Sequence, residues 1–312
     1  MNRRDWCRKA AVAAGAVALA ANAPTGAWAD TQTDAPWGLA RISQAAKLGQ
    51  PPLRFTYDPK WGQGVNVYVL GTGINTTHDD LAGRVAWGTN TTDDGTNGDC
   101  HGESTHVAAT AVGTRYGVAK KAKVVAVKAV GCNGGADMPD VIAAVQWVRD
   151  HANGLKGNVL LLGVVMDKNT ELDKAIEAAA DQNIVVVVAH AGNTNQDACQ
   201  TSPARAPKAI TVGATDPNDL KATSSNYGKC VDILAPGVDI LSASSGSRTA
   251  IKTRSGTSMA AAHTAGVAAA LLSEGVRPAD TATKITSLAA RGVITDLDST
   301  TPNLLLQVPT RN

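Results

Sequence analysis

The chain has 312 residues, of which 44% are hydrophobic and 18% are charged, and its formal net charge is +2. This length suits one sizeable domain or two small ones. The first 29 residues hold four basic residues against one acidic residue, so the remainder carries a net charge of −1. That balance gives no electrostatic reason to expect nucleic acid or an anionic membrane as a partner.

The basic N-terminus has the pattern of an export signal over residues 1–29. Two arginines precede a weakly apolar, alanine-rich stretch at residues 10–21, and Ala27 and Ala29 supply the small residues at which signal peptidase cuts. The paired arginines favour a twin-arginine route, although ordinary secretion fits the same pattern. A membrane anchor is the alternative, but ~12 apolar residues are too short for a ~30 Å hydrocarbon core. We therefore expect an exported protein, extracellular or periplasmic, that begins at Asp30.

The cysteines agree with export. Removal of the signal takes Cys7 and leaves an even number, which is typical of disulfides in an exported chain. Metal ligation is the alternative, but no C-x-x-C pair or close histidine pairing accompanies the four cysteines. The composition therefore favours disulfides among Cys100, Cys132, Cys199 and Cys230.

Between residues 64 and 290, short β-branched runs alternate with longer segments of helical period. Apolar runs without alternation, separated by helices, are typical of a parallel sheet covered on both faces, with its sites at the carboxyl ends of the strands. No repeat or linker divides the chain, so we expect one α/β domain over residues 30–312. Strands are predicted at residues 65–70, 123–128, 159–162, 184–188 and 209–212, and helices at residues 138–151, 171–181 and 257–272.

Residues 255–263 read S-G-T-S-M-A-A-A-H. A glycine turn before a small-residue helix puts Ser258 at a helix N-terminus, where backbone N–H groups and the helix dipole favour negative charge on a reacting oxygen. An ordinary N-capping serine would have the same local pattern. The segment resembles the nucleophile signature S-G-T-S-M-A-x-P-H of the subtilases, with Ser258 at the nucleophile position. Ala262 departs from it, because the family has proline there.

The resemblance extends from residues 36–42 to about residue 306. It implies a subtilisin-like three-layer fold with a mostly parallel central sheet. Residues 191–193 look like the oxyanion segment of the family, in which the amide of Asn193 would donate a hydrogen bond to the developing charge. One such donor is worth roughly 10²–10³ in kcat. A turn asparagine is the alternative for Asn193 alone.

The cysteine separations of 32 and 31 residues look like the two disulfides of aqualysin-type bacterial enzymes. The resemblance therefore implies the pairs Cys100–Cys132 and Cys199–Cys230. It also places the chain near the proteinase K and aqualysin branch.

The same spacing sets the register at the catalytic histidine. The family reads D-C-N-G-H-G-T-H-V-A-G-T, and residues 99–110 align with it without a gap. Glu103 therefore stands in place of the histidine. His101 is two residues early, a rotation of ~200° on a helix, and His106 matches the second, structural histidine of the motif. Neither is expected to act as the base.

The aspartate position is altered too. The strand-ending V-x-D-T-G of the family corresponds to residues 69–73, where Gly71 replaces the aspartate. The resemblance thus implies a degenerate triad that keeps Ser258 and loses its two partners.

The expected peptide-binding edge also differs from the family. The family's N-M-S-L-G-G-G aligns with residues 161–167, where valines and a methionine add bulk in place of glycines. A histidine replaces a small residue beside the same pocket. Drift of an unused surface is favoured over a remodelled specificity pocket. The residues expected to line the substrate site are Gly163, Val164, Val165 and His190, with Asn133 and Gly134 on the other side.

A calcium site is implied by the likeness to proteinase K relatives. The carbonyls of Pro207 and Ala209 and the carboxylate of Asp232 match the strong Ca²⁺ site of that branch. Oxygen ligands of this kind suit a hard cation. A solvated or capping role is the alternative for Asp232.

Three functions remain open. The first is a non-catalytic, monomeric homologue that binds a peptide or protein. It is favoured because only residues 30–35 separate the expected signal cleavage from the subtilase-like start, which leaves no room for the inhibitory propeptide of active relatives. The second is a weak or acid-pH serine endopeptidase that uses Ser258 with Glu103. It would resemble sedolisins, although Val107 and Asn193 stand where those enzymes have aspartates. The third is a structural secreted protein.

Overall fold

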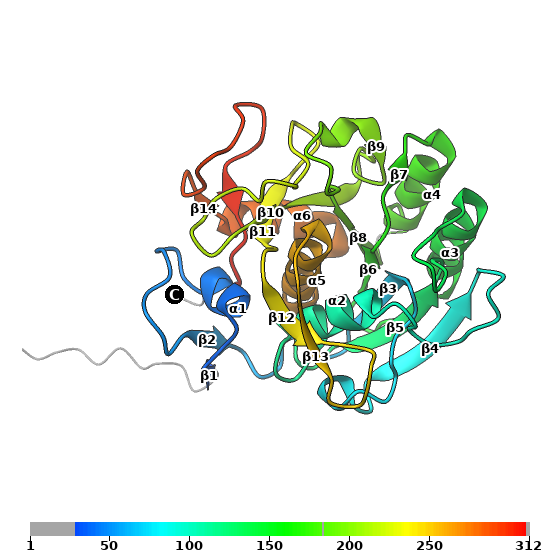
Figure 1. Ribbon diagram of the computed structural model, residues 1–312, viewed down its shortest axis with the longest axis horizontal. Coiled ribbons are helices and arrows are strands. Elements are labelled where there is room, and N and C mark those ends of the chain that lie inside the picture. The colour runs from blue at the N-terminus through cyan, green and yellow to red at the C-terminus, as the bar shows by residue number, and fades with distance from the viewer. Residues whose placement is uncertain (1–28, 183, 310–312) are drawn as a thin grey trace, which may run out of the picture.

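The computed structural model describes residues 29–182 and 184–309, and a nine-stranded sheet runs through its centre in the order β14-β15-β11-β10-β8-β6-β3-β5-β4 (Figure 1). Every neighbouring pair in it is parallel except β14 and β15. The predicted mostly parallel sheet is therefore confirmed. Its strands are β3 (Asn66–Gly71), β4 (Val85–Asn90), β5 (Lys123–Lys128), β6 (Asn158–Leu162), β8 (Val185–His190), β10 (Ala209–Thr215), β11 (Ile233–Pro236), β14 (Ala290–Arg291) and β15 (Leu304–Leu305).

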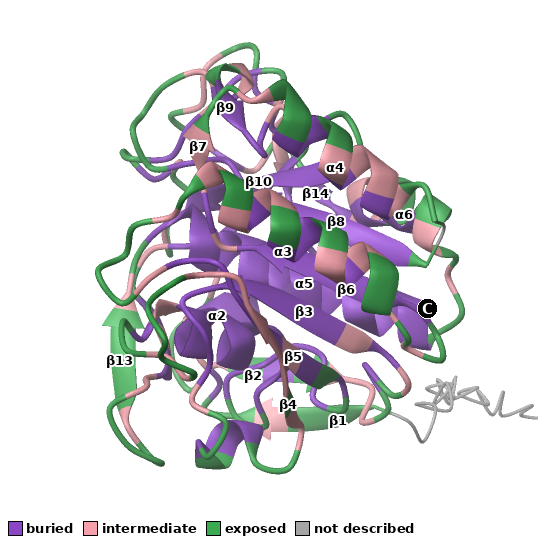
Figure 2. Cartoon of the chain, turned by 90° about the vertical axis from the view of Figure 1, so that its right-hand side faces the viewer, coloured by how far each residue is buried: buried purple, intermediate pink, exposed green. Residues whose placement is uncertain are grey.

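Helices cover both faces of this sheet. The side chains of β3 alternate between two apolar clusters: Val67 and Val69 pack with α2 and α5, whereas Tyr68 and Leu70 pack with α3 and α4. Because helices cover each face, the strands are buried along almost their whole length, as Figure 2 shows for β3, β6 and β8. The helices are α1 (Trp37–Ile42), α2 (Glu103–Val112), α3 (Met138–His151), α4 (Thr170–Ala180), α5 (Thr257–Ser273) and α6 (Pro278–Leu288), with 3₁₀ turns at Asp79–Leu81 and Ala198–Gln200.

Helix α5 is buried from end to end, which its alanine-rich sequence allows. A Cβ on Gly266 would lie 2.6 Å from the carbonyl oxygen of Ala111, so the backbones of α5 and α2 approach as closely as glycine permits. This packing brings the N-termini of α2 and α5 to the sheet edge at which the parallel strands end.

The predicted elements agree with the structure to within a residue or two at most of their ends. The main difference is β10, which extends three residues beyond its predicted end to Thr215 because its last residues pair with β11. Three short two-stranded sheets lie outside the central one: β1 (Asp30–Thr33) with β2 (Arg54–Tyr57), β7 (Met166–Asp167) with β9 (Thr201–Ser202), and β12 (Ile240–Ala243) with β13 (Ile251–Arg254).

The expected export signal falls almost wholly outside the described residues. Within residues 29–182 and 184–309, no helix has the length and apolarity needed to cross a membrane.

Candidate functional site

The candidate residues gather where β3, β6 and β8 end. These three strands are parallel neighbours, so Gly71, Gly163 and His190 lie at one edge of the sheet. The N-termini of α2 and α5 face the same edge. We call Asn193, Gly256, Thr257 and Ser258 the nucleophile half of the cleft, and Gly71, Thr72, Glu103 and Ser104 the base half.

Ser258 is the second residue of α5 and is 4% exposed. Gly256 precedes the helix and provides no side-chain cap. Because helical Cα–Cβ bonds tilt toward the N-terminus, the hydroxyl of Ser258 points to the open end of α5. Among the described residues, neither this hydroxyl nor the backbone N–H of Ser258 has a hydrogen-bond partner. The serine is thus placed as a nucleophile would be, but no base is hydrogen-bonded to it.

The side chain of Asn193 is oriented by Thr257. Its Oδ1 accepts hydrogen bonds from the backbone N–H (2.8 Å) and the hydroxyl (3.0 Å) of Thr257. The amide Nδ2, which can only donate, therefore points away from Thr257. Asn193 is exposed, so this donor is accessible from outside the protein.

His190 ends β8 beside this pair and is 6% exposed. Its Nδ1 lies 3.0 Å from the hydroxyl oxygen of Thr257. Burial lowers the pKa of His190 to about 4, while the charge of Glu103 acts in the opposite direction. The ring is therefore neutral at pH 7. The charge of the Glu103 carboxylate, which belongs to the base half, favours the protonated ring but does not outweigh burial.

Gly71 ends β3, and the space beside it is filled. The hydroxyl of Ser104 lies 2.3 Å from the position that a Cβ on Gly71 would take. That hydroxyl accepts a hydrogen bond of 2.7 Å from the backbone N–H of Thr72. Since Ser104 is only 3% exposed, an aspartate at position 71 would require this side chain to move. Ser104 stands where the subtilase motif has glycine, which was the one sequence signal for this contact.

Glu103 is the first residue of α2 and is 31% exposed. One of its carboxylate oxygens lies 3.8 Å from Nδ1 of His101. Asp99 holds the loop before the helix, because its carboxylate accepts hydrogen bonds from the N–H groups of Gly102 (2.7 Å) and Thr105 (2.8 Å). These bonds hold the start of α2 in place, with the Glu103 carboxylate beside His101.

The two other nearby histidines make contacts that do not involve Ser258. His101 is exposed, and its ring lies 3.6 Å from the Cβ position of Gly134. His106 is fully buried, and its Nε2 lies 3.0 and 3.1 Å from two carbonyl oxygens. Because carbonyls only accept, Nε2 carries the proton and the ring joins α2 to the β12–β13 hairpin.

The strand edges expected to bind peptide flank the cleft. Val164 is buried, and a methyl group of Val165 lies 3.6 Å from the Cβ position of Gly192, one residue before Asn193. On the other side, Asn133 and Gly134 form a tight turn, in which Asn133 Oδ1 accepts from the N–H of Gly135 (2.9 Å). Val165 is therefore in contact distance of Gly192, next to Asn193.

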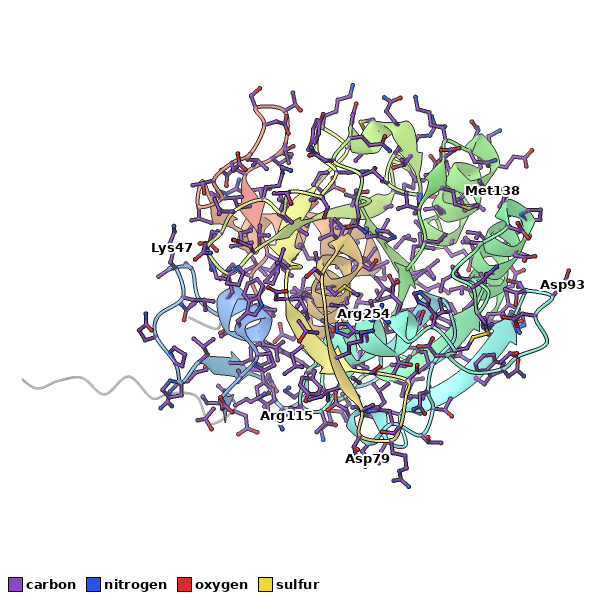
Figure 3. All side chains as sticks on the ribbon, in the orientation of Figure 1. Lys47, Asp79, Asp93, Arg115, Met138 and Arg254 are labelled. Atoms are coloured by element: carbon purple, nitrogen blue, oxygen red, sulfur yellow. A yellow bond between two sulfur atoms is a disulfide. The ribbon has the colours of Figure 1, made fainter. Side chains whose placement is uncertain are left out.

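Sequence reasoning missed Arg254, the last residue of β13, labelled in Figure 3. Its Nη2 donates to the carbonyl oxygen of His101 at 2.9 Å, ahead of α2. Its Nε is buried and, within the described residues, has no acceptor. Arg254 thus adds a positive charge between the two helix N-termini.

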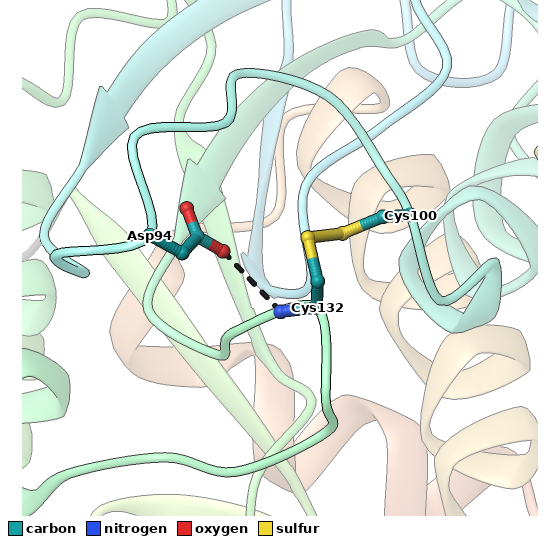
Figure 4. A group of neighbouring side chains, drawn as sticks. All are labelled: Asp94, Cys100 and Cys132. Carbon is teal, nitrogen blue, oxygen red and sulfur yellow. Dashed lines mark hydrogen bonds between the residues drawn. A yellow bond between two sulfur atoms is a disulfide. The ribbon is translucent and has the colours of Figure 1, made fainter.

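Both predicted disulfides, Cys100–Cys132 and Cys199–Cys230, are confirmed. Figure 4 shows Asp94 beside the first of them, where it accepts a hydrogen bond from the N–H of Cys132 (3.2 Å). Asp94 and the two sulfurs are near enough to hold a metal ion, but disulfide sulfurs are not thiolates. The carboxylate pairs instead with the fully buried ammonium of Lys128 at 3.0 Å.

The residues expected to bind calcium come together away from the cleft. Pro207, Ala209 and Asp232 line a cavity of about 460 Å³ between β10 and α6. Asp232 is exposed as a residue, but its carboxyl lies in this cavity, where burial raises its pKa and a hydrogen bond from Thr211 N–H (2.8 Å) opposes the rise. Among the ion pairs of the described residues none involves Asp232.

The fold and this geometry can now be compared with known proteins. Residues 62–301 match the Subtilase family of peptidases. The chain belongs to that family. It is 41% identical over 298 residues to the subtilisin-like serine protease Pen c 2 of Penicillium citrinum, covering 88% of this chain and 65% of the relative. Alkaline protease 2 of Aspergillus fumigatus is 40% identical over 298 residues, with coverages of 88% and 60%.

A solved structure is also similar to this subtilase. The crystal structure of a cold-adapted subtilisin-like serine proteinase superposes with a TM-score of 0.83 at 38% identity, covering 89% of this chain and 100% of that one. The subtilisin-like fold is therefore confirmed. This subtilase spans less than two thirds of the length of the curated relatives named above.

Proposed function

We propose that this chain is an exported subtilase whose cleft binds peptides and has little or no peptidase activity. The observation that carries the proposal is the contact between Gly71 and Ser104. A catalytic aspartate must reach the base from this position, but the chain has no side chain at Gly71 and a buried hydroxyl where one would start. Ser258 accordingly has no hydrogen-bonded base among the described residues.

Glu103 is a poor replacement for the histidine. A serine needs a base within hydrogen-bond reach as it attacks, and the base must return the proton to the leaving amine. A free glutamate has a pKa of ~4.3, so at neutral pH it holds a proton too weakly to protonate an amine. The remaining parts of the cleft, which are hydrogen-bond donors and strand edges, bind peptide without cleaving it.

An acid-pH serine endopeptidase is the second candidate. It is favoured by the helix N-terminus at Ser258, which has no side-chain cap, and by the similarity of the chain to relatives that are named as proteases. A glutamate base would work best near its own pKa of ~4.3. Turnover that rises below pH 5 and is lost in Glu103→Gln would support this candidate.

A fluorophosphonate probe tests the proposal without a guessed substrate. We expect no labelling of Ser258 in the purified chain between pH 4 and pH 9, and measurable binding of a fluorescent peptide library. Ser258→Ala is the labelling control. Labelling of Ser258 at a rate typical of active serine peptidases would overturn the proposal.

We further propose that Ca²⁺ binds at the cavity of Pro207, Ala209 and Asp232. Its charge would offset the buried carboxylate and join β10 to the start of β11. Binding to the folded state alone stabilises it by about 2.7 kcal/mol when the ion is at 100 times its Kd. Melting curves with calcium and with a chelator should differ, and Asp232→Asn should remove the difference. An unchanged curve for the parent chain would contradict the site.

The proposal includes export of the chain and removal of residues 1–29. The small residues Ala27 and Ala29 place the cut before Asp30, and this cut starts the mature chain at β1. N-terminal sequencing of secreted material should begin at Asp30. A start at Met1 would contradict it.

A further inference from the structure

A cavity of about 170 Å³ lies between α1, β12 and α5, and none of its lining residues belongs to either half of the cleft. Gly38 of α1 and His263 of α5 line it. Its other walls are apolar or aromatic side chains, those of Pro36, Trp37, Tyr116, Ile240 and Leu241. An engineered apolar cavity of about 150 Å³ is known to bind benzene. The volume therefore suits a ligand built on one six-membered ring.

His263 is 1% exposed, and two hydrogen bonds fix its ring. Its Nδ1 lies 3.0 Å from the carbonyl oxygen of Pro236 and 3.0 Å from that of Met259. Because carbonyls only accept, Nδ1 carries the proton and Nε2 keeps a lone pair. Burial lowers the pKa of His263 to about 4, so the ring is neutral at pH 7. His263 is thus held in the tautomer whose Nε2 is an acceptor.

Nε2 of His263 is left uncovered by a glycine. A Cβ on Gly38 would lie 2.7 Å from this nitrogen, so a side chain at that position would block it. Within the part of the chain that the structure describes, Nε2 has no donor, since both hydrogen bonds of the ring are made by Nδ1. Buried polar atoms of side chains normally have a partner. The protein therefore leaves an acceptor open in the wall of an otherwise apolar cavity.

Water is a poor occupant of this cavity. A buried water typically has about three polar partners. The indole N–H of Trp37 already donates to the carbonyl oxygen of Val238 at 3.1 Å, which leaves the lining side chains Nε2 of His263 and the hydroxyl of Tyr116. That hydroxyl can either donate or accept, so it sets no preference of its own. The walls therefore favour a ligand with much apolar surface and one hydrogen-bond donor.

We propose that this cavity binds a monocyclic phenol, whose hydroxyl donates to Nε2 of His263. The rings of Trp37 and Tyr116 in the walls favour an aromatic ligand over an aliphatic alcohol. A phenol with a pKa of ~10 keeps its proton at pH 7 and can donate it in a hydrogen bond. The same chemistry could come from a free phenol or from a tyrosine side chain of a second protein. The inference does not depend on peptide binding in the cleft.

The experiment titrates the exported chain, with both disulfides formed, with two ligands of matched shape and follows binding by NMR. Phenol and toluene have nearly the same size, but toluene has no donor. We expect a phenol Kd on the order of 1 mM, as suits a ligand of so few atoms. Phenol should bind about three- to tenfold more tightly than toluene, the contribution of one neutral hydrogen bond. The resonance of Nε2 of His263 should shift with phenol and stay in place with toluene.

Two variants with a matched control locate the effect. His263→Asn retains an N–H donor for the two carbonyls but removes Nε2, so it should bind phenol no more tightly than toluene. Leu241→Trp leaves His263 unchanged and adds bulk to the cavity wall, so it should weaken binding of both ligands by about tenfold or more. Leu155→Trp makes the same replacement at a residue that is 95% exposed and outside this cavity. That control should bind phenol within about twofold of the parent chain.

A third pair of ligands separates the two sources of the phenol. N-acetyltyrosinamide binding more tightly than para-cresol would support a tyrosine of a second protein, and the reverse order would support a free phenol. Equal binding of phenol and toluene to the parent chain would overturn the inference. So would the absence of saturable phenol binding at about ten times the expected Kd, or phenol binding that Leu241→Trp leaves unchanged. Since Leu241→Trp leaves the histidine in place, the test stands even where His263→Asn fails to fold.

Discussion

The two halves of the cleft differ in what their side chains do. In the nucleophile half, Thr257 orients Asn193, and the donors at the start of α5 remain open. In the base half, the hydroxyl of Ser104 occupies the space beside Gly71 and is bound to the N–H of Thr72. One half therefore leaves hydrogen-bond donors without an acceptor among the described residues, whereas the other pairs its polar groups internally. In the base half, Ser104 and Gly71 fit together, so a change at either position affects the other.

The largest expected effect comes from rebuilding the base half. In subtilisin, loss of the catalytic histidine costs about 2 × 10⁶ in kcat, so a typical rate of ~10 s⁻¹ would fall to the order of 10⁻⁵ s⁻¹. The parent chain should therefore show no measurable casein cleavage at pH 7. Gly71→Asp with Glu103→His and Ser104→Gly should increase fluorophosphonate labelling by about 10²-fold or more, the usual contribution of a general base.

The matched control is the double variant that retains Ser104. The new aspartate would begin 2.3 Å from the Ser104 hydroxyl, so Gly71→Asp with Glu103→His alone should gain much less. Ser258→Ala in the triple variant should return labelling to background. Robust cleavage by the unmodified chain, lost in Ser258→Ala, would show that the base half still works.

Some features of the two halves could be predicted from the sequence, and others could not. The parallel sheet followed from apolar runs separated by helices, and the place of Ser258 followed from a glycine before a small-residue helix. Both are local patterns with a fixed periodicity. The identity of the residue at position 71 was also readable, as was the unusual serine at position 104.

Their contact was not readable, because it joins the end of β3 to the first turn of α2 only in the folded chain. The same holds for Arg254, which reaches the carbonyl of His101 from a distant hairpin. The ion pair of the fully buried Lys128 with Asp94, beside the first disulfide, was not readable either. Polar contacts of this kind depend on tertiary packing, which the periodicity of strands and helices does not predict.

Removing each disulfide in turn compares how much the two halves of the cleft depend on a cross-link for their stability. Cys100–Cys132 ties the loop before α2 and Cys199–Cys230 lies beyond Asn193, with sequence separations of 32 and 31 residues. In the chain-entropy model each should contribute roughly 3–4 kcal/mol to the free energy of unfolding. Replacing either pair by alanines should therefore lower stability to a similar extent in urea denaturation. A loss confined to one pair would mean that the two halves unfold separately.

Three of the buried histidines should make the chain sensitive to acid. Burial lowers the pKa values of His106, His190 and His263 to about 4 each. The unfolded chain takes up these protons near pH 6.5, so stability is present above that pH and is lost as pH falls from 6.5 toward 4. Each histidine should account for up to about 3 kcal/mol of the loss.

Replacements of these histidines that keep their hydrogen bonds test this dependence of stability on pH. His263 donates from Nδ1 to carbonyls of Pro236 and Met259, so asparagine is the closest neutral replacement, and glutamine suits the Nε2 of His106. Each should flatten the decline of urea stability between pH 6.5 and pH 4 by about a third. His151→Gln, at an exposed position on α3, should leave the slope unchanged.

The smallest expected effect on stability comes from removing one hydroxyl group from each half of the cleft. Ser104→Ala removes the acceptor of the buried Thr72 N–H, and Thr257→Ala removes the acceptor of Gly192 N–H at 3.2 Å. An unsatisfied buried donor costs about 1–3 kcal/mol. The two variants should therefore lose similar stability in urea, whereas Ser287→Ala, at an exposed position on α6, should change it by less than about 0.5 kcal/mol.

Peptide binding should distinguish the same two variants. The hydroxyl of Thr257 supplies one of the two hydrogen bonds that orient the amide of Asn193, so its loss lets that side chain rotate and should weaken peptide binding severalfold. Ser104 makes no contact with any donor of the nucleophile half among its described hydrogen bonds, so Ser104→Ala should bind peptide within about twofold of the parent. If both variants weakened binding equally, the halves would be coupled through the ligand, and the base half would have a binding role that its closed geometry does not reveal.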